Sequence, residues 1–128
     1  MAEGHFYTIV IWEVRAGARA SDLEELTRNG ILPQYKEVPG VLSVKLFRIQ
    51  EGEDVNKFMA MTIYESREAY NNWWAKGGQA LLAWQQQNKA VVEKWVDTAT
   101  PARRHNMTLL IDAEFPPGTP KINFTPEN

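Results

Sequence analysis

The sequence of 128 residues contains no cysteine, and this absence excludes several kinds of chemistry. Disulfide scaffolds, thiolate metal sites and cysteine nucleophiles all require a thiol. The chain also has little excess charge, because its 14 basic and 16 acidic side chains leave a net charge of −2. Without a basic surface, we expect no non-specific binding to nucleic acid or to an anionic membrane.

Long hydrophobic runs are missing as well, since no run approaches the roughly 18 apolar residues of a bilayer-spanning helix. The start of the chain, Met-Ala-Glu-Gly-His, lacks the basic beginning and apolar core of a secretory signal. We therefore expect a cytoplasmic protein without a membrane partner. The sequence also lacks a P-loop, a dinucleotide fingerprint and a Ser-His-Asp spacing, so nucleotide-driven chemistry and serine hydrolysis have no support.

What the sequence does contain is the pattern of one α+β domain. Segments rich in β-branched and aromatic residues predict strands at residues 6–14, 41–49, 58–64 and 107–115. Helical patterns at residues 21–38 and 66–96 separate the first strand from the second and the third from the fourth. A polar turn at residues 50–54 predicts a hairpin between the middle strands. This order is the ferredoxin-like βαββαβ pattern, with an antiparallel sheet and its helices on one face.

Local signals mark where these elements begin and break. Ser21 and Glu24 have the spacing of a capping box at the start of the first helix, and Ser66 is an N-cap candidate for the second. Pro33, together with the preceding Asn-Gly pair, predicts a break in the first helix. Gly77-Gly78 predicts a bend in the second. The loop expected at residues 98–106 includes a solvated Arg-Arg-His cluster.

The distribution of apolar residues on the sheet predicts a homodimer. In the first strand Val10 and Trp12 share one face, and Ile9 and Ile11 share the other. The helices suffice to cover only one face, so a second copy of the sheet is the expected cover for the other. We place the domain at residues 1–115, followed by a Pro-rich tail at residues 116–128 that is mobile or lies across a neighbour.

Three short segments carry a resemblance to a known family. They are Val-Pro-Gly-Val at residues 38–41, Tyr-Glu-Ser-Arg-Glu-Ala-Tyr at residues 64–70, and Asn-Asn-Trp-Trp at residues 71–74. Over residues 6–115 the chain resembles the dimeric α+β barrel superfamily and, within it, the antibiotic biosynthesis monooxygenase family. That family includes monooxygenases that oxidise polycyclic phenols without metal or flavin, haem-degrading enzymes, and many proteins without an assigned role.

The resemblance implies a cofactor-independent monooxygenase that acts on a small phenolic or polycyclic compound. The expected substrate-binding residues are Tyr70, Asn72, Trp73 and Trp84, with aromatic rings for stacking and an amide for a hydrogen bond. No cofactor and no metal are expected, and no catalytic residue is assigned. A positive charge for a bound phenolate would come from one of three basic side chains: Lys45, Arg48 and Arg104.

The haem-degrading branch of the family fits the sequence less well. Asn72-Trp73 matches the Asn-Trp pair of that branch at the start of the second helix. The haem-ligating histidine would fall near Ala83, and the asparagine of the first strand would fall near Val10. Neither position has the required side chain, and neutral imidazole cannot be replaced by apolar groups as an iron ligand.

The alternative is a non-catalytic dimeric protein that binds a small molecule or responds to stress, because His5 and the Val-Pro-Gly segment also resemble the stress-responsive α/β-barrel group. In that case Trp73, Trp84 and Trp95 form a helical stripe that fills the core, which is the commoner role of such stripes. We expect the neighbouring Trp74 to point away from Trp73. His5 and His105 are expected at opposite ends of neighbouring strands, which argues against a shared metal site.

Overall fold

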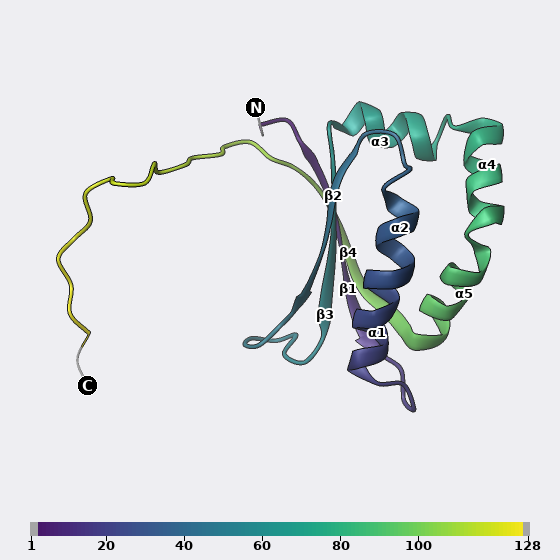
Figure 1. The fold of residues 1–128 in the computed structure, drawn as a ribbon, viewed down its shortest axis with the longest axis horizontal. Helices are drawn as coiled ribbons and strands as arrows, with labels where there is room; N and C mark the ends of the chain where they lie inside the picture. The colour runs from purple at the N-terminus through teal and green to yellow at the C-terminus, as the bar shows by residue number, and fades with distance from the viewer. Residues whose placement is uncertain (1–2, 127–128) are drawn as a thin grey trace.

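The computed structural model describes residues 3–126 and contains a four-stranded antiparallel sheet with its helices on one side (Figure 1). The strands are β1 (Phe6–Val14), β2 (Val41–Arg48), β3 (Phe58–Tyr64) and β4 (Ala99–Thr108). They lie in the order β2-β3-β1-β4, and β2 and β3 form the predicted hairpin. The ferredoxin-like α+β fold predicted from the sequence is thereby confirmed.

The first helical region follows β1 and continues without interruption, with an irregular turn where the sequence predicted a break or kink. It consists of α1 (Ala20–Leu26), a π-helical turn η1 (Thr27–Ile31) and α2 (Leu32–Tyr35). The wide turn includes Gly30, and Pro33 follows it directly in the first turn of α2. A proline has no N–H for the preceding helical turn, which favours an irregular turn at this place. A Cβ on Gly30 would lie 2.9 Å from Val91 Cγ1, so the absence of a side chain allows close helix packing.

The N-cap of this helix is Arg19 and not Ser21, so the helix begins two residues before the predicted position. The helix begins at Ala20, and the carboxylate of Asp22 accepts a hydrogen bond from the backbone N–H of Arg19 at 3.1 Å. Asp22 therefore does what Glu24 was expected to do, because an acidic side chain three residues after the N-cap reaches the N-cap amide wherever the helix begins.

The second helical region is divided into α3 (Arg67–Trp74), α4 (Gly78–Gln87) and α5 (Lys89–Thr98). Ser66 caps α3, since its Oγ accepts from the Ala69 N–H at 3.0 Å, as predicted. The predicted interruption at Gly77-Gly78 is confirmed, and Gly78 has a φ of +55°. A second break at Asn88 was not predicted; its side-chain amide donates to the Trp84 carbonyl at 2.9 Å and so satisfies the end of α4.

The prediction for the fourth strand is wrong, because β4 occupies Ala99–Thr108 instead of residues 107–115. It follows α5 directly and pairs with the whole of β1. As an edge strand it is largely exposed, so it needs no apolar alternation and reads as a loop in the sequence. Pro101 lies at the register shift opposite Trp12, where the ladder is irregular and a missing N–H is tolerated.

This shift also corrects the expectations for the Arg-Arg-His cluster, which is part of β4 and not a loop. Arg103 forms an ion pair with Asp54 in the loop after β2. His105 lies opposite Ile9 in the middle of β1, so it is not at the opposite end from His5. Within residues 3–126, His, Asp and Glu side chains form no group of three or more that would hold a metal ion.

The core on the helix side of the sheet consists of two clusters. One contains Phe6, Val38, Tyr64, Trp73 and Trp84. The other contains Leu23, Phe58, Trp95 and Ala99, with Trp12 and Trp95 in edge contact at 5.3 Å between ring centroids. The expected single stripe of tryptophans is therefore divided, because α4 and α5 are separate helices.

The opposite face of the sheet has no cover within the described residues and is mostly apolar. The strand register places eight apolar residues on this open face: Tyr7, Ile9, Ile11, Phe47, Met59, Met61, Ile63 and Met107. Phe47 and Met107 are exposed, whereas Ile11 and Ile63 are buried and the others are half-buried. Beyond β4, residues 110–126 form an extended arm that leaves the sheet on this side (Figure 1). None of the helices within residues 3–126 is long and apolar enough to cross a membrane.

Candidate functional site

Seven aromatic side chains gather between the sheet and the helices, and we call them the aromatic cluster. They come from β1, α2, β3, α3 and α4, and they are Phe6, Tyr35, Tyr64, Tyr70, Trp73, Trp74 and Trp84. Neighbouring ring centroids lie 5.0–6.4 Å apart, and most pairs meet edge to face. This is the preferred geometry of aromatic pairs.

Trp84 is at the centre of the tryptophan contacts. Its ring centroid lies 5.8 Å from that of Trp73 and 5.7 Å from that of Trp74. Successive helix positions point roughly 100° apart, which led to the expectation that these neighbours would diverge. Both rings nevertheless contact Trp84, because α4 lies where both side chains of α3 reach it.

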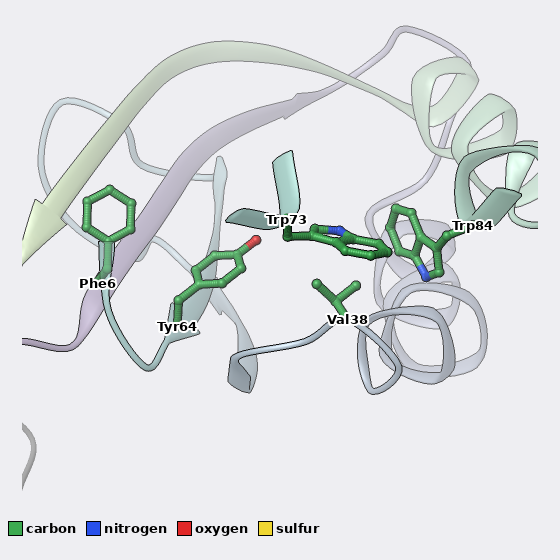
Figure 2. Packing of buried hydrophobic residues seen from close by; sticks show 5 residues of the cluster. All are labelled: Phe6, Val38, Tyr64, Trp73 and Trp84. Atoms are coloured by element: carbon green, nitrogen blue, oxygen red, sulfur yellow. The ribbon is translucent and has the colours of Figure 1, made fainter. Parts of the chain in front are cut away.

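The polar atoms of the cluster are unequally satisfied. The Trp74 indole N–H donates to the Tyr64 hydroxyl at 3.0 Å, and the Trp84 indole N–H donates to the Gln34 carbonyl at 3.3 Å. Trp73 Nε1 is buried and has no hydrogen-bond partner among the described residues. Figure 2 shows the Tyr64 hydroxyl pointing toward Trp73, with Trp84 beyond it.

A row of polar side chains crosses the sheet beside the aromatic cluster. Thr8 in β1 lies opposite Thr62 in β3 and Asn106 in β4. Directly opposite residues point to the same face, and this face is the helix side because Phe6 of the same parity belongs to the core. Thr8 Oγ1 is buried and, within residues 3–126, unpaired. The aromatic cluster is thus bordered by polar side chains, one of which, Thr8, has a buried hydroxyl without a partner among the described residues.

The hydroxyls of the cluster are held in their neutral form. Burial raises the pKa of Tyr35, and it raises the pKa of Tyr64 well above the usual range of a phenol. The positive charge of Arg104 partly offsets this increase in both pKa values, but the net shift of each remains upward. Both tyrosines are therefore hydrogen-bonding groups at neutral pH and not bases.

The three basic side chains that the sequence offered for a phenolate are in different places. Arg104 lies opposite Val10 on the helix side of the sheet, where its charge acts on the cluster tyrosines. Arg48 pairs with Glu24 at 3.6 Å and lies over the Phe58 ring of the other core cluster. Lys45 lies opposite Met61 on the open face. Only Arg104 of these three lies beside the aromatic cluster.

Of the predicted substrate-binding residues, Tyr70, Trp73 and Trp84 belong to the aromatic cluster. Asn72 is exposed on α3 and lies outside it. Tyr64 and Thr8, which also belong to the candidate site, were not predicted from the sequence. They could be found only from the strand register, which pairs Phe6 with Tyr64 and Thr8 with Thr62. The sequence alone does not give this register.

Two surface hollows lie away from the aromatic cluster. One of about 460 Å³ lies between α1 and α5 and is lined partly by Asp22, Gly30 and Val91. The other, of about 360 Å³, lies between the first helical region and the outer part of the sheet, beside Val44 and Leu46. Trp73 and Trp84 line neither hollow, and each is 8% exposed.

Comparison with known proteins gives a consistent family and fold. The model of the family described as antibiotic biosynthesis monooxygenase matches residues 5–87. Comparison with curated proteins gave no match. SnoaB of Streptomyces nogalater, a cofactor-independent oxygenase, is similar in structure with a TM-score of 0.56 and 12% identity, covering 89% of this chain and 98% of SnoaB.

Two further solved structures share the fold. The heme-degrader MhuD of Mycobacterium tuberculosis, solved with two hemes in its active site, has a TM-score of 0.59 and 24% identity, covering 85% of this chain and 99% of MhuD. A nipsnap family protein of unknown function from Agrobacterium tumefaciens has a TM-score of 0.58 and 16% identity, covering 91% of this chain and 96% of its own. At these identities the similarity shows the fold alone.

Haem does not fit the residues that this chain offers. At the two positions where the resemblance led us to expect haem-binding side chains, Val10 is buried and apolar, and α4 carries Ala83 next to Leu82, which is 54% exposed. Without a nitrogen ligand in α4, the chain has no axial group for the iron at that position.

Proposed function

Since the chain belongs to the antibiotic biosynthesis monooxygenase family, we propose that it is a cofactor-independent monooxygenase acting on a small phenolic or polycyclic aromatic compound. The substrate would bind at the aromatic cluster and the polar row beside it. The binding residues of this proposal are Tyr70, Trp73 and Trp84, with Arg104 as the source of positive charge. Asn72, which was also predicted to bind the substrate, is exposed outside the cluster and has no role in the proposal.

The observation that carries the proposal is the buried, unpaired indole N–H of Trp73. Burying a donor without an acceptor costs about 1–3 kcal/mol, so such groups usually have a partner. A carbonyl or phenolate oxygen on a flat ligand stacked in the cluster would accept this hydrogen bond. The unpaired hydroxyl of Thr8 on the same side of the sheet would bind a second oxygen in the same way.

In this proposal the substrate supplies the electrons. When a ring CH₂ group of a hydroxylated anthrone is oxidised to C=O, one atom of dioxygen enters the carbon and the other leaves as water with the two hydrogens. The deprotonated substrate reduces dioxygen directly, so the balance needs no other reductant. The protein would orient the ring, exclude water and stabilise the anion with the Arg104 charge and the neutral Tyr64 hydroxyl.

The proposed enzyme is a homodimer in which two sheets pack through their open faces. The support is the row of apolar side chains on that face, including Phe47 and Met107, which are 42% and 41% exposed. Apolar side chains on an uncovered sheet face are typical of an interface.

The close packing of the tryptophans favours a second candidate, a non-catalytic dimeric protein of the same fold. Trp73 and Trp84 are as buried as Trp95, which belongs to the other core cluster. In that case the aromatic cluster stabilises the domain, and a small molecule binds elsewhere or not at all.

Oxygen consumption by the full chain with a hydroxylated anthrone tests these two candidates. We expect turnover by the wild type, measured with an oxygen electrode and by quinone absorbance. Trp73→Phe should lower kcat/KM by about tenfold or more, because loss of one donor to a charged oxygen corresponds to at least about 1.4 kcal/mol.

Trp95→Phe is the matched control, because Trp95 has the same 8% exposure as Trp73 but belongs to the other cluster. It should reduce stability to a similar extent and leave kcat/KM unchanged. Equal losses in both variants would show that Trp73 acts only as core. Absence of both turnover and binding across a panel of anthrones and naphthols would favour the non-catalytic candidate.

A further inference from the structure

The helix α4 is attached to the rest of the domain by few contacts. Trp84 is its one buried side chain, and Leu81 is half-buried against the same aromatic cluster. Among the described residues, the side chains of α4 form a single hydrogen bond to another helix or strand, from the Trp84 indole N–H to the Gln34 carbonyl at 3.3 Å. Figure 1 shows α4 on the outer side of the molecule, away from the sheet. A helix held mainly by one side chain belongs to the less stable parts of a fold.

The chain is irregular at both ends of α4. At the start, Gly78 has a φ of +55°, and a Cβ on Gly77 would collide with the Trp73 carbonyl. At the end, Asn88 has a φ of −107° and a ψ of 12°, between the helical and extended regions, and it separates α4 from α5. Hinge rotation is absorbed by a few residues of this kind at the ends of an element. The two breaks therefore allow α4 to move as a unit while α3 and α5 stay in place.

The aromatic cluster beneath α4 is closed in this structure. Trp73 and Trp84 line neither of the two surface hollows, and their rings meet edge to face with centroids 5.8 Å apart. Figure 2 shows Trp84 at one end of the cluster, with Trp73 between it and Tyr64. A flat ligand that stacks on Trp73 needs a route that this packing does not offer. Outward movement of α4 would take Trp84 with it and open the cluster at that end.

Gln34 of α2 connects the first helical region to the end of α4. Its side chain is polar, yet the residue is buried, with 4% of its surface exposed. Its backbone carbonyl accepts from the Trp84 indole, and its Nε2 donates to the Asn88 carbonyl at 3.3 Å. The Asn88 side-chain amide in turn donates to the Trp84 carbonyl at 2.9 Å. We call these three bonds the Gln34 latch. A buried amide is costly unless it is hydrogen-bonded, so the latch favours the position of α4 in which its bonds are made.

We propose that α4 is a lid over the aromatic cluster and that Gln34 is the positioning residue that holds it closed. Opening separates Gln34 from Trp84 and Asn88 and withdraws the Trp84 ring from Trp73. Exposure of one large aromatic side chain keeps the open form at about 1% of the molecules. The entry of a phenolic ligand through this opening rests on the proposed function, whereas the movement of α4 does not.

Solvent exchange of the Trp84 indole N–H, followed by NMR, measures the opening without a ligand. Gln34→Met keeps the length of the side chain but cannot bond to Asn88. Thr27→Val is the matched control, because Thr27 is also buried and its hydroxyl bonds to the Leu23 carbonyl, within the first helical region and at 2.8 Å. Both variants should speed exchange of the most protected backbone amides of β1, since both lose a hydrogen bond of the native state.

Only Gln34→Met should also speed exchange of the Trp84 indole N–H, by about fivefold, because a bond of the closed form is lost. The signal is identified by its absence in Trp84→Phe. Equal effects of Gln34→Met and Thr27→Val on this signal would mean that it exchanges through global unfolding, and would overturn the lid. An unchanged Trp84 signal in Gln34→Met would overturn the role of Gln34.

Stopped-flow quenching of tryptophan fluorescence by the hydroxylated anthrone dithranol, without oxygen, connects the lid to the proposed function. The latch is present before and after binding, so its loss changes the barrier to entry and exit but not the affinity. Gln34→Met should raise the association and dissociation rate constants by about fivefold each and leave Kd unchanged. A weaker Kd with an unchanged association rate constant would show a merely structural role and overturn the proposal. Absence of binding by the wild type would overturn the proposed function, and the exchange of the Trp84 N–H would then decide on the lid by itself.

Discussion

At the scale of single residues, the Tyr64 hydroxyl links the aromatic cluster to the pH dependence of stability. It accepts a hydrogen bond from Trp74 at 3.0 Å, and burial raises its pKa. An unfolded tyrosine ionises near a pKa of about 10. Above that pH the unfolded chain loses a proton that the folded chain keeps, so the free energy of unfolding falls as pH rises.

Tyr64→Phe should therefore lower the free energy of unfolding at neutral pH and make its decline at alkaline pH less steep. Near neutral pH it should lower the free energy of unfolding by about 1 kcal/mol, because the Trp74 N–H loses its acceptor. Between about pH 8 and about pH 11, stability should decline less steeply than in the wild type, because one group that favours the unfolded state is gone. Urea unfolding across this range measures both effects. Parallel slopes in the two proteins would contradict the assignment.

At the scale of secondary-structure elements, the contact between Gly30 and Val91 fixes how closely α5 approaches η1. A Cβ on Gly30 would lie 2.9 Å from Val91 Cγ1, which is closer than carbon atoms pack. Valine is stiff at χ1, so it cannot easily move aside. The glycine thus lowers helix propensity locally and permits the packing of two helices that are far apart in sequence.

A double-mutant cycle tests this contact. Gly30→Ala alone should destabilise the protein by about 1 kcal/mol, since overpacking outweighs the gain in helix propensity. In a Val91→Ala background the same change should become neutral or stabilising, which gives a coupling energy of about 1 kcal/mol. Val92→Ala is the control background, because Val92 is 46% exposed and does not meet Gly30. Thermal unfolding measures all the variants, and equal coupling in both backgrounds would argue against direct contact.

The elements that were predicted correctly are those with strong local signals. Apolar runs located β1, β2 and β3, and Ser66 and the Gly77-Gly78 pair located helix boundaries. β4 was misplaced because an exposed edge strand tolerates arginines and a proline, whereas the following residues 110–115 have the composition of a strand without a partner in their own chain. The break at Asn88 depends on a side-chain bond to Trp84, which no sequence pattern announced.

The candidate site was predictable only in part, because some of its residues come together through pairing of strands that are distant in the sequence. Tyr70 and Trp73 are three residues apart on one helix, so their common direction follows from helical periodicity. Tyr64 and Thr8 reach the site through strand pairings between distant segments, and Arg104 does so through a strand that the sequence analysis did not recognise. Long-range register therefore decides which polar atoms border the aromatic cluster.

At the scale of the whole molecule, the open face of the sheet determines the expected assembly. Ile9 lies opposite Met61 in the two central strands of this face. Light scattering should give the mass of two chains for the wild type, and Ile9→Lys should give the mass of one, since an unpaired charge in an apolar interface is costly. Leu82→Lys on α4 is the control, because Leu82 is 54% exposed on a helix. A wild-type mass of one chain would remove the argument.

The division of the tryptophans between two core clusters also gives the domain an intrinsic spectroscopic signal. Trp73, Trp74 and Trp84 have ring centroids within 6.4 Å of one another, and Trp12 and Trp95 lie 5.3 Å apart in the other cluster. Indoles held this close and at steep angles couple their electronic transitions, which gives a paired positive and negative band in ultraviolet circular dichroism. Trp12→Phe would remove the Trp12–Trp95 coupling and leave the coupled circular dichroism bands of the aromatic cluster. Loosening of the proposed site would then be visible spectroscopically even while the rest of the domain stays folded.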